Sequence, residues 1–206
     1  MATLSVTHPD IIEFITAKQT QGRLAKFNMS VNCTDEFMTL VNLGDPDAEW
    51  NLEFPNTKHP KYKEEWFGNI KNWKAKGYET IVYSTVKVQW LWNLIMESTY
   101  NRNEPGVLFL DRANSFNPLS YAEFILSTNP CGEQTLPAGG VCDLGTTNLT
   151  QYVRPDGKGF DIPKLTAAVK TLVRFLDNVN SRSRAPLPQY EYSMQNKRRI
   201  GCGVMG

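Results

Sequence analysis

The sequence lacks the features of a membrane protein and the residue spacings of a zinc site. Its longest apolar runs are far too short to cross a bilayer, and its first residues lack the charged and apolar regions of a secretory signal peptide. The only histidines, His8 and His59, lie far from the cysteines, and there is no Cys-x-x-Cys pair. These absences disfavour a zinc site or a Cys–His hydrolase. We expect a cytoplasmic protein with no membrane partner and no bound metal.

An excess of charge of one sign is also missing, because 22 Lys and Arg residues balance 21 Asp and Glu residues. A nucleic-acid-binding domain usually carries a basic surplus, so we expect no nucleic-acid partner. The phosphate loop GxxxxGK[ST] does not occur, and no GxGxxG follows the strand that we predict over residues 107–110. The sequence thus lacks both of these glycine-rich nucleotide loops.

The composition that remains is that of an ordinary globular protein, with 41% hydrophobic and 21% charged residues over 206 positions. This length suggests one domain or a large part of one. The hydrophobic spacing predicts helices and strands in rough alternation, which indicates an α/β architecture. We predict helices over residues 10–22, 35–41, 86–100 and 162–179, and strands over residues 27–31 and 107–110.

Local patterns refine these predictions. Asp10 and Glu13 form the pattern of a capping box at the start of the first helix. Alternation in residues 27–31 predicts one apolar and one polar face, and the unbroken apolar run at 107–110 favours an interior strand. Residues 44–80 are rich in prolines, tryptophans and charges, so we interpret them as a peripheral excursion with short helices that aromatic side chains hold in place.

The four cysteines are not expected to form a disulfide framework in a reducing compartment. We interpret Cys33 and Cys202 as small buried residues. Cys131 differs because Pro130 restricts the backbone before it and Gly132 frees the backbone after it, which predicts a loop that presents the thiol.

In an extended loop, residues two apart point to the same side. Asn129, Cys131 and Glu133 would then offer an amide, a thiol and a carboxylate to one small volume. A purely structural role for Cys131 stays open on these residues alone. Cys142 follows eleven residues later, behind the flexible stretch 137–140, and could face the same substrate or approach Cys131.

Two motifs carry a resemblance to a known family. Asn-Pro-Cys-Gly-Glu-Gln at 129–134, followed by Val-Cys-Asp-Leu-Gly-Thr-Thr-Asn-Leu at 141–149, resembles the active-site signature of ribonucleotide reductase large subunits. The resemblance covers nearly the whole chain and is weakest over residues 44–80. Further similar segments are Ala2–Ile11, Phe27–Met38, Glu104–Arg112 and Arg198–Gly206.

The resemblance implies that residues 1–206 are part of a ten-stranded α/β barrel, with the key cysteine on a central finger loop. It implies that Cys131 becomes a thiyl radical that abstracts the 3′ hydrogen of a ribonucleotide. Glu133 would take the proton of the 3′ hydroxyl, and Asn129, Pro130 and Gly132 would bind the substrate. Cys142 and a second cysteine would supply two electrons by forming a disulfide, which a thioredoxin- or glutaredoxin-type protein would reduce again.

The same resemblance implies a cofactor and an effector. Asn-Pro-Cys-Gly-Glu-Gln is most similar to the adenosylcobalamin-dependent class, while a radical from a separate metal-containing subunit stays open. The polar stretch from Lys18 to Arg23 corresponds in position to a specificity loop between an effector nucleotide and the substrate base. Gln19, Gln21 and Arg23 are its candidate residues, and a solvated helix end is the alternative.

We expect other parts of such an enzyme to lie outside residues 1–206. These are the second cysteine of the Cys142 pair, a nucleotide-binding N-terminal region, a second half-barrel and a C-terminal redox tail. The chain would then need complementary reductase fragments. Two other hypotheses stay open: a non-catalytic half of a split reductase, and a thiol-redox protein in which Cys131 and Cys142 form a reversible disulfide.

Overall fold

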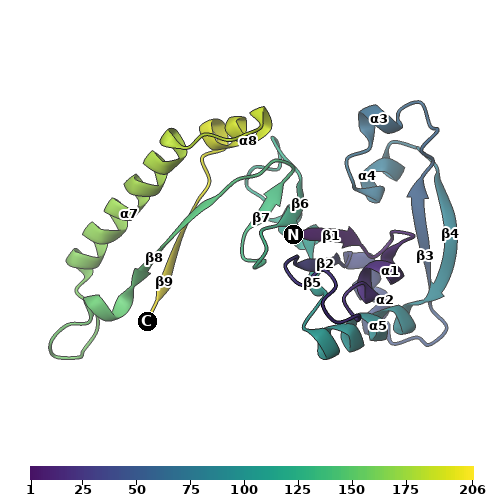
Figure 1. The fold of residues 1–206 in the computed structure, drawn as a ribbon, viewed down its shortest axis with the longest axis horizontal. Helices are drawn as coiled ribbons and strands as arrows, with labels where there is room; N and C mark the ends of the chain where they lie inside the picture. Colours follow the sequence, from purple (N-terminus) through teal and green to yellow (C-terminus); the bar gives the residue numbers. More distant parts are fainter. The chain divides into compact units, whose positions relative to one another are not determined.

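The structure is a computed structural model that describes all residues from 1 to 206. The chain forms two compact units, Met1–Ala138 and Gly139–Gly206 (Figure 1). The first contains β1 (Ala2–Ser5), α1 (Ile11–Thr16), β2 (Met29–Asn32), α2 (Asp35–Leu43), β3 (Glu49–Pro55), α3 (Tyr62–Glu65), α4 (Ile70–Ala75), β4 (Thr80–Lys87), α5 (Val88–Arg102), β5 (Gly106–Leu108), α6 (Leu110–Ser115), β6 (Ile125–Thr128) and β7 (Thr135–Pro137). The second contains β8 (Asp143–Asn148), the 3-10 helix η1 (Leu149–Tyr152), α7 (Ile162–Arg182), α8 (Pro188–Tyr192), the π-helix η2 (Ser193–Lys197) and β9 (Ile200–Met205).

A three-stranded parallel sheet in the order β1-β2-β5 lies at the centre of the first unit. Met29, Ser30 and Val31 of the middle strand β2 are all buried. The prediction of one polar and one apolar face was therefore wrong for this strand, because a central parallel strand is covered on both faces. The predicted strand at 107–110 exists as β5, but it lies at an edge of this sheet and ends at Leu108.

The main hydrophobic core packs helices α1, α2 and α5 with the sheet. Its buried members are Val6, Ile11, Ile15, Val31, Cys33, Phe37, Trp50, Leu52, Val88, Leu91 and Ile95. The predicted helix at 86–100 is confirmed as α5, and its apolar spacing buries Val88, Leu91 and Ile95 as that pattern indicated.

The first helix is shorter than predicted and lacks its predicted cap. Asp10 has φ −87° and ψ 11°, and its side chain makes no capping hydrogen bond. An N-cap residue normally has an extended backbone that directs its side chain at the free amides of the first turn, and Asp10 does not. Thr34, before α2, has this extended backbone, with ψ 156°. Its hydroxyl accepts a hydrogen bond from the Phe37 amide at the start of α2.

The interpretation of residues 44–80 as peripheral was wrong for their first part. Strand β3 pairs with β4 in an antiparallel hairpin, and both Trp50 and Leu52 belong to the core. The Trp50 indole donates a hydrogen bond to the Val6 carbonyl oxygen at 3.1 Å. Figure 1 shows α3 and α4 at the far end of this hairpin. There the predicted aromatic cluster is confirmed, with Trp73 only 1% exposed and its ring 6.0 Å from that of Trp66.

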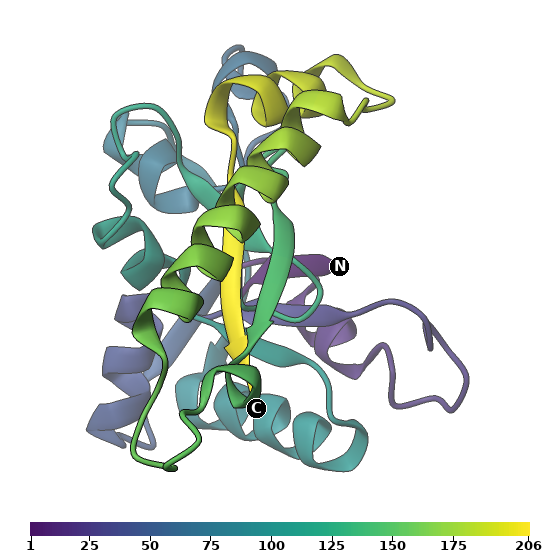
Figure 2. The same ribbon diagram turned by 90° about the vertical axis from the view of Figure 1, so that its left-hand side faces the viewer.

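The second unit is a β-α-β crossover. Strands β8 and β9 pair in parallel from Asp143↔Ile200 to Asn148↔Met205, and α7 lies across them (Figure 2). The predicted helix at 162–179 is confirmed and extends to Arg182. Its predicted apolar face is only partly covered within this unit, since Leu176 is buried but Ile162 is 59% exposed.

The strands form four separate sheets, and none of them closes into a barrel. The α/β fold class is confirmed, because parallel strands are joined through helices in both units. None of the helices combines the length and the apolar character needed to cross a lipid bilayer.

Candidate active site

Cys131 lies near the tip of a β-hairpin. Strands β6 and β7 pair up to Thr128↔Thr135, and residues 129–134 form the connection. Within the connection, the Gly132 amide donates to the Asn129 carbonyl oxygen at 3.0 Å. Gly132 has φ +84°, a left-handed conformation that strains residues with a side chain. The segment is therefore a loop that presents an exposed thiol, as the Pro-Cys-Gly pattern predicted.

The amide and the carboxylate beside this thiol contact each other. Asn129 Nδ2 donates to Glu133 Oε1 at 2.5 Å, and Asn129 Oδ1 accepts from the Gln134 backbone amide at 3.1 Å. Asn129 therefore connects the side chain of Glu133 to the start of the returning strand. This arrangement fixes where a carboxylate oxygen lies relative to the loop, and an exposed carboxylate can accept a proton from a ligand.

The thiol lines a hollow of about 360 Å³ in the first unit. Pro130, Cys131 and Gly132 form part of its wall. The rest comes from Met1, Asn28, Met29, Ser30, Asn103, Glu104, Gly106, Val107 and Leu108. Most of these residues lie at or just before the starts of β1, β2 and β5, so the hollow lies at the amino end of the parallel sheet. Asn129 and Glu133 do not line it, so the expected single wall of thiol, amide and carboxylate is only partly present.

The other candidate thiol, Cys142, belongs to the second unit. It lies directly before β8, is half-buried, and its Sγ is 3.6 Å from the Asp143 carbonyl oxygen. None of the four cysteines is in a disulfide.

Cys202 is also in the second unit but cannot pair with Cys142 there. The β8–β9 register places Cys202 opposite Gly145, three residues beyond Cys142. At ~3.3 Å per strand residue, their Cα atoms are about 10 Å apart along the strands. A disulfide needs a Cα separation below about 7 Å. Cys202 is exposed, so our interpretation of it as a buried residue was wrong.

Cys33 is the buried cysteine that the sequence predicted. It is fully buried among the core side chains, and this burial raises the pKa of its thiol to about 12. A buried thiol with a raised pKa forms little of the nucleophilic thiolate, and it cannot be reached by a substrate or a redox partner. Cys33 is therefore a packing residue.

The candidate specificity residues lie in turns between α1 and β2. Helix α1 ends at Thr16, so the stretch from Lys18 begins two residues after the end of the helix. Gln19 contacts the end of α5, where its carbonyl oxygen accepts from Arg102 Nη2 at 3.1 Å. Gln21 and Arg23 are exposed to solvent.

Two residues that we did not single out from the sequence border the thiol loop. Asn28 Nδ2 donates to the Pro130 carbonyl oxygen at 3.2 Å. Glu104 forms an ion pair with Lys18 and accepts a hydrogen bond from the Met29 amide. Nothing in a sequence pattern connects positions 28 and 130, which are 102 residues apart.

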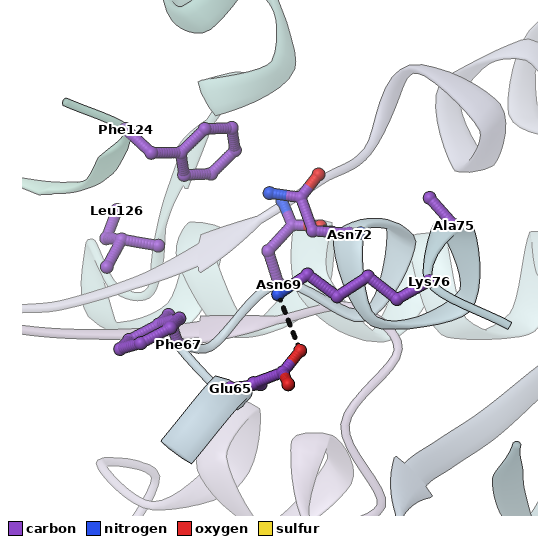
Figure 3. Close-up of a pocket in the computed structure, with 8 residues that line it drawn as sticks. All are labelled: Glu65, Phe67, Asn69, Asn72, Ala75, Lys76, Phe124 and Leu126. Carbon is purple, nitrogen blue, oxygen red and sulfur yellow. Dashed lines mark hydrogen bonds and ion pairs between the residues drawn. The ribbon is translucent and has the colours of Figure 1, made fainter. Parts of the chain in front are cut away.

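A second hollow of about 400 Å³ lies between α4 and strand β6. Figure 3 shows its apolar side, formed by Phe67, Phe124 and Leu126, opposite an ion pair between Lys76 and Glu65. Asn69, Asn72 and Ala75 complete its lining. None of the predicted site residues lines this hollow, so the hollow beside Cys131 is the better candidate for the active site.

Fold and site together define an α/β protein that holds one exposed thiol at a hairpin tip, beside a paired amide and carboxylate. Comparison with known proteins gives the family. A family model described as "Ribonucleotide reductase, barrel domain" matches residues 1–206. The chain belongs to the ribonucleotide reductase family.

Similar proteins agree with this assignment. The chain is 35% identical over its whole length to the vitamin B12-dependent ribonucleoside-diphosphate reductase of Thermoplasma acidophilum, of which it covers 24%. It is 34% identical to the protein of that name from Mycobacterium tuberculosis, of which it covers 26%. Over 97% of its length it is 29% identical to the ribonucleoside-diphosphate reductase large subunit of Caenorhabditis elegans, again covering 26%. The chain thus spans about a quarter of the length of these relatives.

Proposed function

We propose that this chain is the catalytic segment of a ribonucleotide reductase and reduces ribonucleotides to 2′-deoxyribonucleotides. The observation that carries the proposal is the loop 129–134, in which the family signature presents an exposed Cys131 at a hollow of about 360 Å³. Such an activity would serve deoxyribonucleotide biosynthesis for DNA replication. The names of the relatives favour a ribonucleoside diphosphate over a triphosphate as substrate.

In the proposed reaction, Cys131 acts first as a thiyl radical and takes the hydrogen atom from C3′ of the ribose. Glu133 accepts the proton of the 3′ hydroxyl, and Asn129 holds the hydroxyl groups by hydrogen bonds. The hydrogen bond between Asn129 and Glu133 supports this division of roles, because it orients the carboxylate within the loop. The backbone of Pro130 and Gly132 shapes the wall that the substrate contacts.

The 2′ hydroxyl then leaves as water. Two thiols, Cys142 and a second cysteine, supply two electrons and two protons and end as a disulfide. Glu133 returns its proton to the 3′ oxygen, and the hydrogen atom returns from Cys131 to C3′, which regenerates the thiyl radical. The net change is one ribonucleotide and two thiols converted to one deoxyribonucleotide, one disulfide and one water. A thioredoxin- or glutaredoxin-type partner resets the disulfide by exchange.

Adenosylcobalamin is the radical source that we propose, in line with the names of two relatives. When bound, it supplies a carbon-centred radical. The exposure of Cys131 fits this chemistry, since its hydrogen atom must be accessible from outside the loop. In this proposal, Cys131 is the group of this chain that such a radical oxidises.

Allosteric control is proposed for the polar stretch with Gln19, Gln21 and Arg23. The exposed side chains of Gln21 and Arg23 can reach an effector nucleotide, while Gln19 is held to α5 through its carbonyl oxygen. Other segments of the reductase would supply the nucleotide-binding region, the second half of the barrel and the partner of Cys142. These complementary segments are partners of the chain in the proposed enzyme.

The test is reconstitution of the chain with the remaining segments of a reductase, followed by an assay of deoxyribonucleotide formation. Product should form with adenosylcobalamin and disappear when the cofactor is omitted. Cys131→Ser should abolish product formation while circular dichroism shows an unchanged fold. The matched control is Cys202→Ser, which changes the other exposed thiol and should keep full activity. Product formation by Cys131→Ser would contradict the proposal.

A further inference from the structure

The loop that carries Cys131 is tied mostly to itself. The Asn129 amide donates to the Gln134 carbonyl oxygen, and the Gln134 amide donates to Asn129 Oδ1. The bond from Asn28 Nδ2 to the Pro130 carbonyl oxygen is the one hydrogen bond that links residues 129–134 to a segment outside the hairpin. Without it, the tip could pivot about its two short strands.

The position of Asn28 is itself fixed by its neighbours in the sheet. Its carbonyl oxygen accepts from the Ala2 amide at 2.8 Å, which extends the β1–β2 pairing by one residue. The next amide, that of Met29, donates to Glu104 Oε1 at 3.1 Å. The other carboxylate oxygen of Glu104 forms an ion pair with Lys18, and both of these side chains are largely buried.

The acceptor in this contact belongs to the peptide group that precedes Cys131. Because a peptide group is planar, a hydrogen bond to the Pro130 carbonyl oxygen also orients the amide nitrogen of Cys131. That orientation limits the directions in which the Cys131 side chain can leave the backbone. Asn28 and Cys131 line the same hollow, so the contact sets where the thiol lies at its edge.

We propose that Asn28 is a positioning residue, which holds the Cys131 loop over the hollow through the Pro130 carbonyl group, and that Glu104 fixes Asn28 in place. This inference rests on the proposed function for its effect on turnover, but the contact itself does not depend on that function. Asn28 acts through the backbone of the loop and touches neither the sulfur nor the reacting atoms.

The experiment compares Asn28→Asp with Asn28→Gln in the 206-residue chain. Asp has the size of Asn but cannot donate a hydrogen bond when ionised, whereas Gln keeps the donor at the end of a longer side chain. Hydrogen–deuterium exchange of the amides in 131–134 should become about fivefold faster in Asn28→Asp and return toward the wild-type rate in Asn28→Gln. Asn93→Asp, an exposed change on α5, is the matched control and should leave the exchange unchanged.

Turnover of the reconstituted reductase provides the second measurement. A thiol displaced by about 1 Å should lower kcat roughly tenfold or more in Asn28→Asp, with KM nearly unchanged. Unchanged loop exchange in folded Asn28→Asp would overturn the inference, and so would accelerated exchange with an unchanged kcat. Neither result would contradict the proposed function. That proposal has its own test and fails if Cys131→Ser forms product. If Asn28→Asp does not fold, Asn28→Ala replaces it. Wild-type exchange rates of the loop amides in Asn28→Ala would also overturn the inference.

Discussion

At the scale of single residues, the environment of each thiol separates the four cysteines more clearly than the sequence does. The Pro-Cys-Gly pattern predicts an exposed Cys131, and the structure agrees because Gly132 can adopt a positive φ. Cys202 was predicted to be buried and is exposed. A cysteine alternating with glycines in a strand gives no local signal of which face is covered, because the covering helix α7 is distant in sequence.

Cys142→Ser tests the proposed electron donor. Replacing one thiol of the pair prevents disulfide formation, so the substrate cannot receive its two electrons and a thioredoxin-type reductant has no disulfide to reset. We expect turnover to stop, with less than about one deoxyribonucleotide formed per active site. Product counting in the reconstituted reductase measures this, and Cys202→Ser should turn over normally. Continued turnover of Cys142→Ser with thioredoxin would remove Cys142 from the proposed pair.

The buried Cys33 thiol makes stability depend on alkaline pH. Its pKa rises from an ordinary 9.0 to about 12 in the folded protein, so above pH 9 the unfolded chain loses this proton while the folded chain keeps it. Folding is therefore favoured below pH 9 and loses this contribution as pH rises toward 12. Between about pH 8 and about pH 10 the loss should be about 1.4 kcal/mol.

The measurement for Cys33 is the free energy of unfolding from urea titrations of the wild type and of Cys33→Val. Other groups also ionise in this range, so the difference between the two proteins isolates the thiol. As pH rises, the free energy of unfolding of the wild type should fall relative to that of Cys33→Val. A difference that is constant from about pH 8 to about pH 10 would show that Cys33 is not buried as a thiol.

At the scale of elements, hydrophobic periodicity predicts individual helices, but it does not predict contacts between segments that are distant in the sequence. Helices α5 and α7 were predictable because their apolar residues recur at helical spacing. Strand β3 also alternates, with Trp50, Leu52 and Phe54 separated by polar residues, but the surrounding prolines and charges obscured it. The contact of Asn28 with the Cys131 loop was not predictable, because only the tertiary fold joins these two segments.

The membership of β3 in the core can be tested with Trp50→Ala. Trp50 is 7% exposed and its indole bonds to Val6, so its removal leaves a cavity and an unpaired carbonyl group. We expect a loss of roughly 3–5 kcal/mol of stability. The control, Tyr83→Ala on the neighbouring strand, changes a residue that is 58% exposed and should cost below about 0.5 kcal/mol.

Tryptophan fluorescence during urea unfolding measures both β3–β4 variants. All five tryptophans lie in the first unit, so the signal reports that unit alone. Equal stability losses for the two variants would show that residues 49–55 are peripheral, as we first interpreted them from the sequence. A large loss of stability for Trp50→Ala alone would show that β3 belongs to the hydrophobic core of the first unit, which carries Cys131.

At the scale of the whole molecule, the chain contains the chemistry of the proposed site but encloses it only in part. Its parallel strands form sheets of three and of two strands, and these sheets do not close. Val204 and Met205 of β9 are more than half exposed, as is Ile162 of α7. The relatives are about four times longer than the stretch that this chain covers, so they contain further segments that could cover such surfaces.

This incompleteness predicts that the 206-residue chain alone forms no deoxyribonucleotide, even with adenosylcobalamin and a thiol reductant present. A radical intermediate must be shielded from water, and an exposed Cys131 at an open hollow offers no such shield. The β8–β9 register also places Cys202 too far from Cys142 for a disulfide between these two cysteines. Adding the remaining segments of a reductase should restore product formation, measured by chromatography of the nucleotides. Turnover by the chain alone would mean that its open sheets already enclose the substrate, and the assignment of the Cys131 hollow would then have to be replaced.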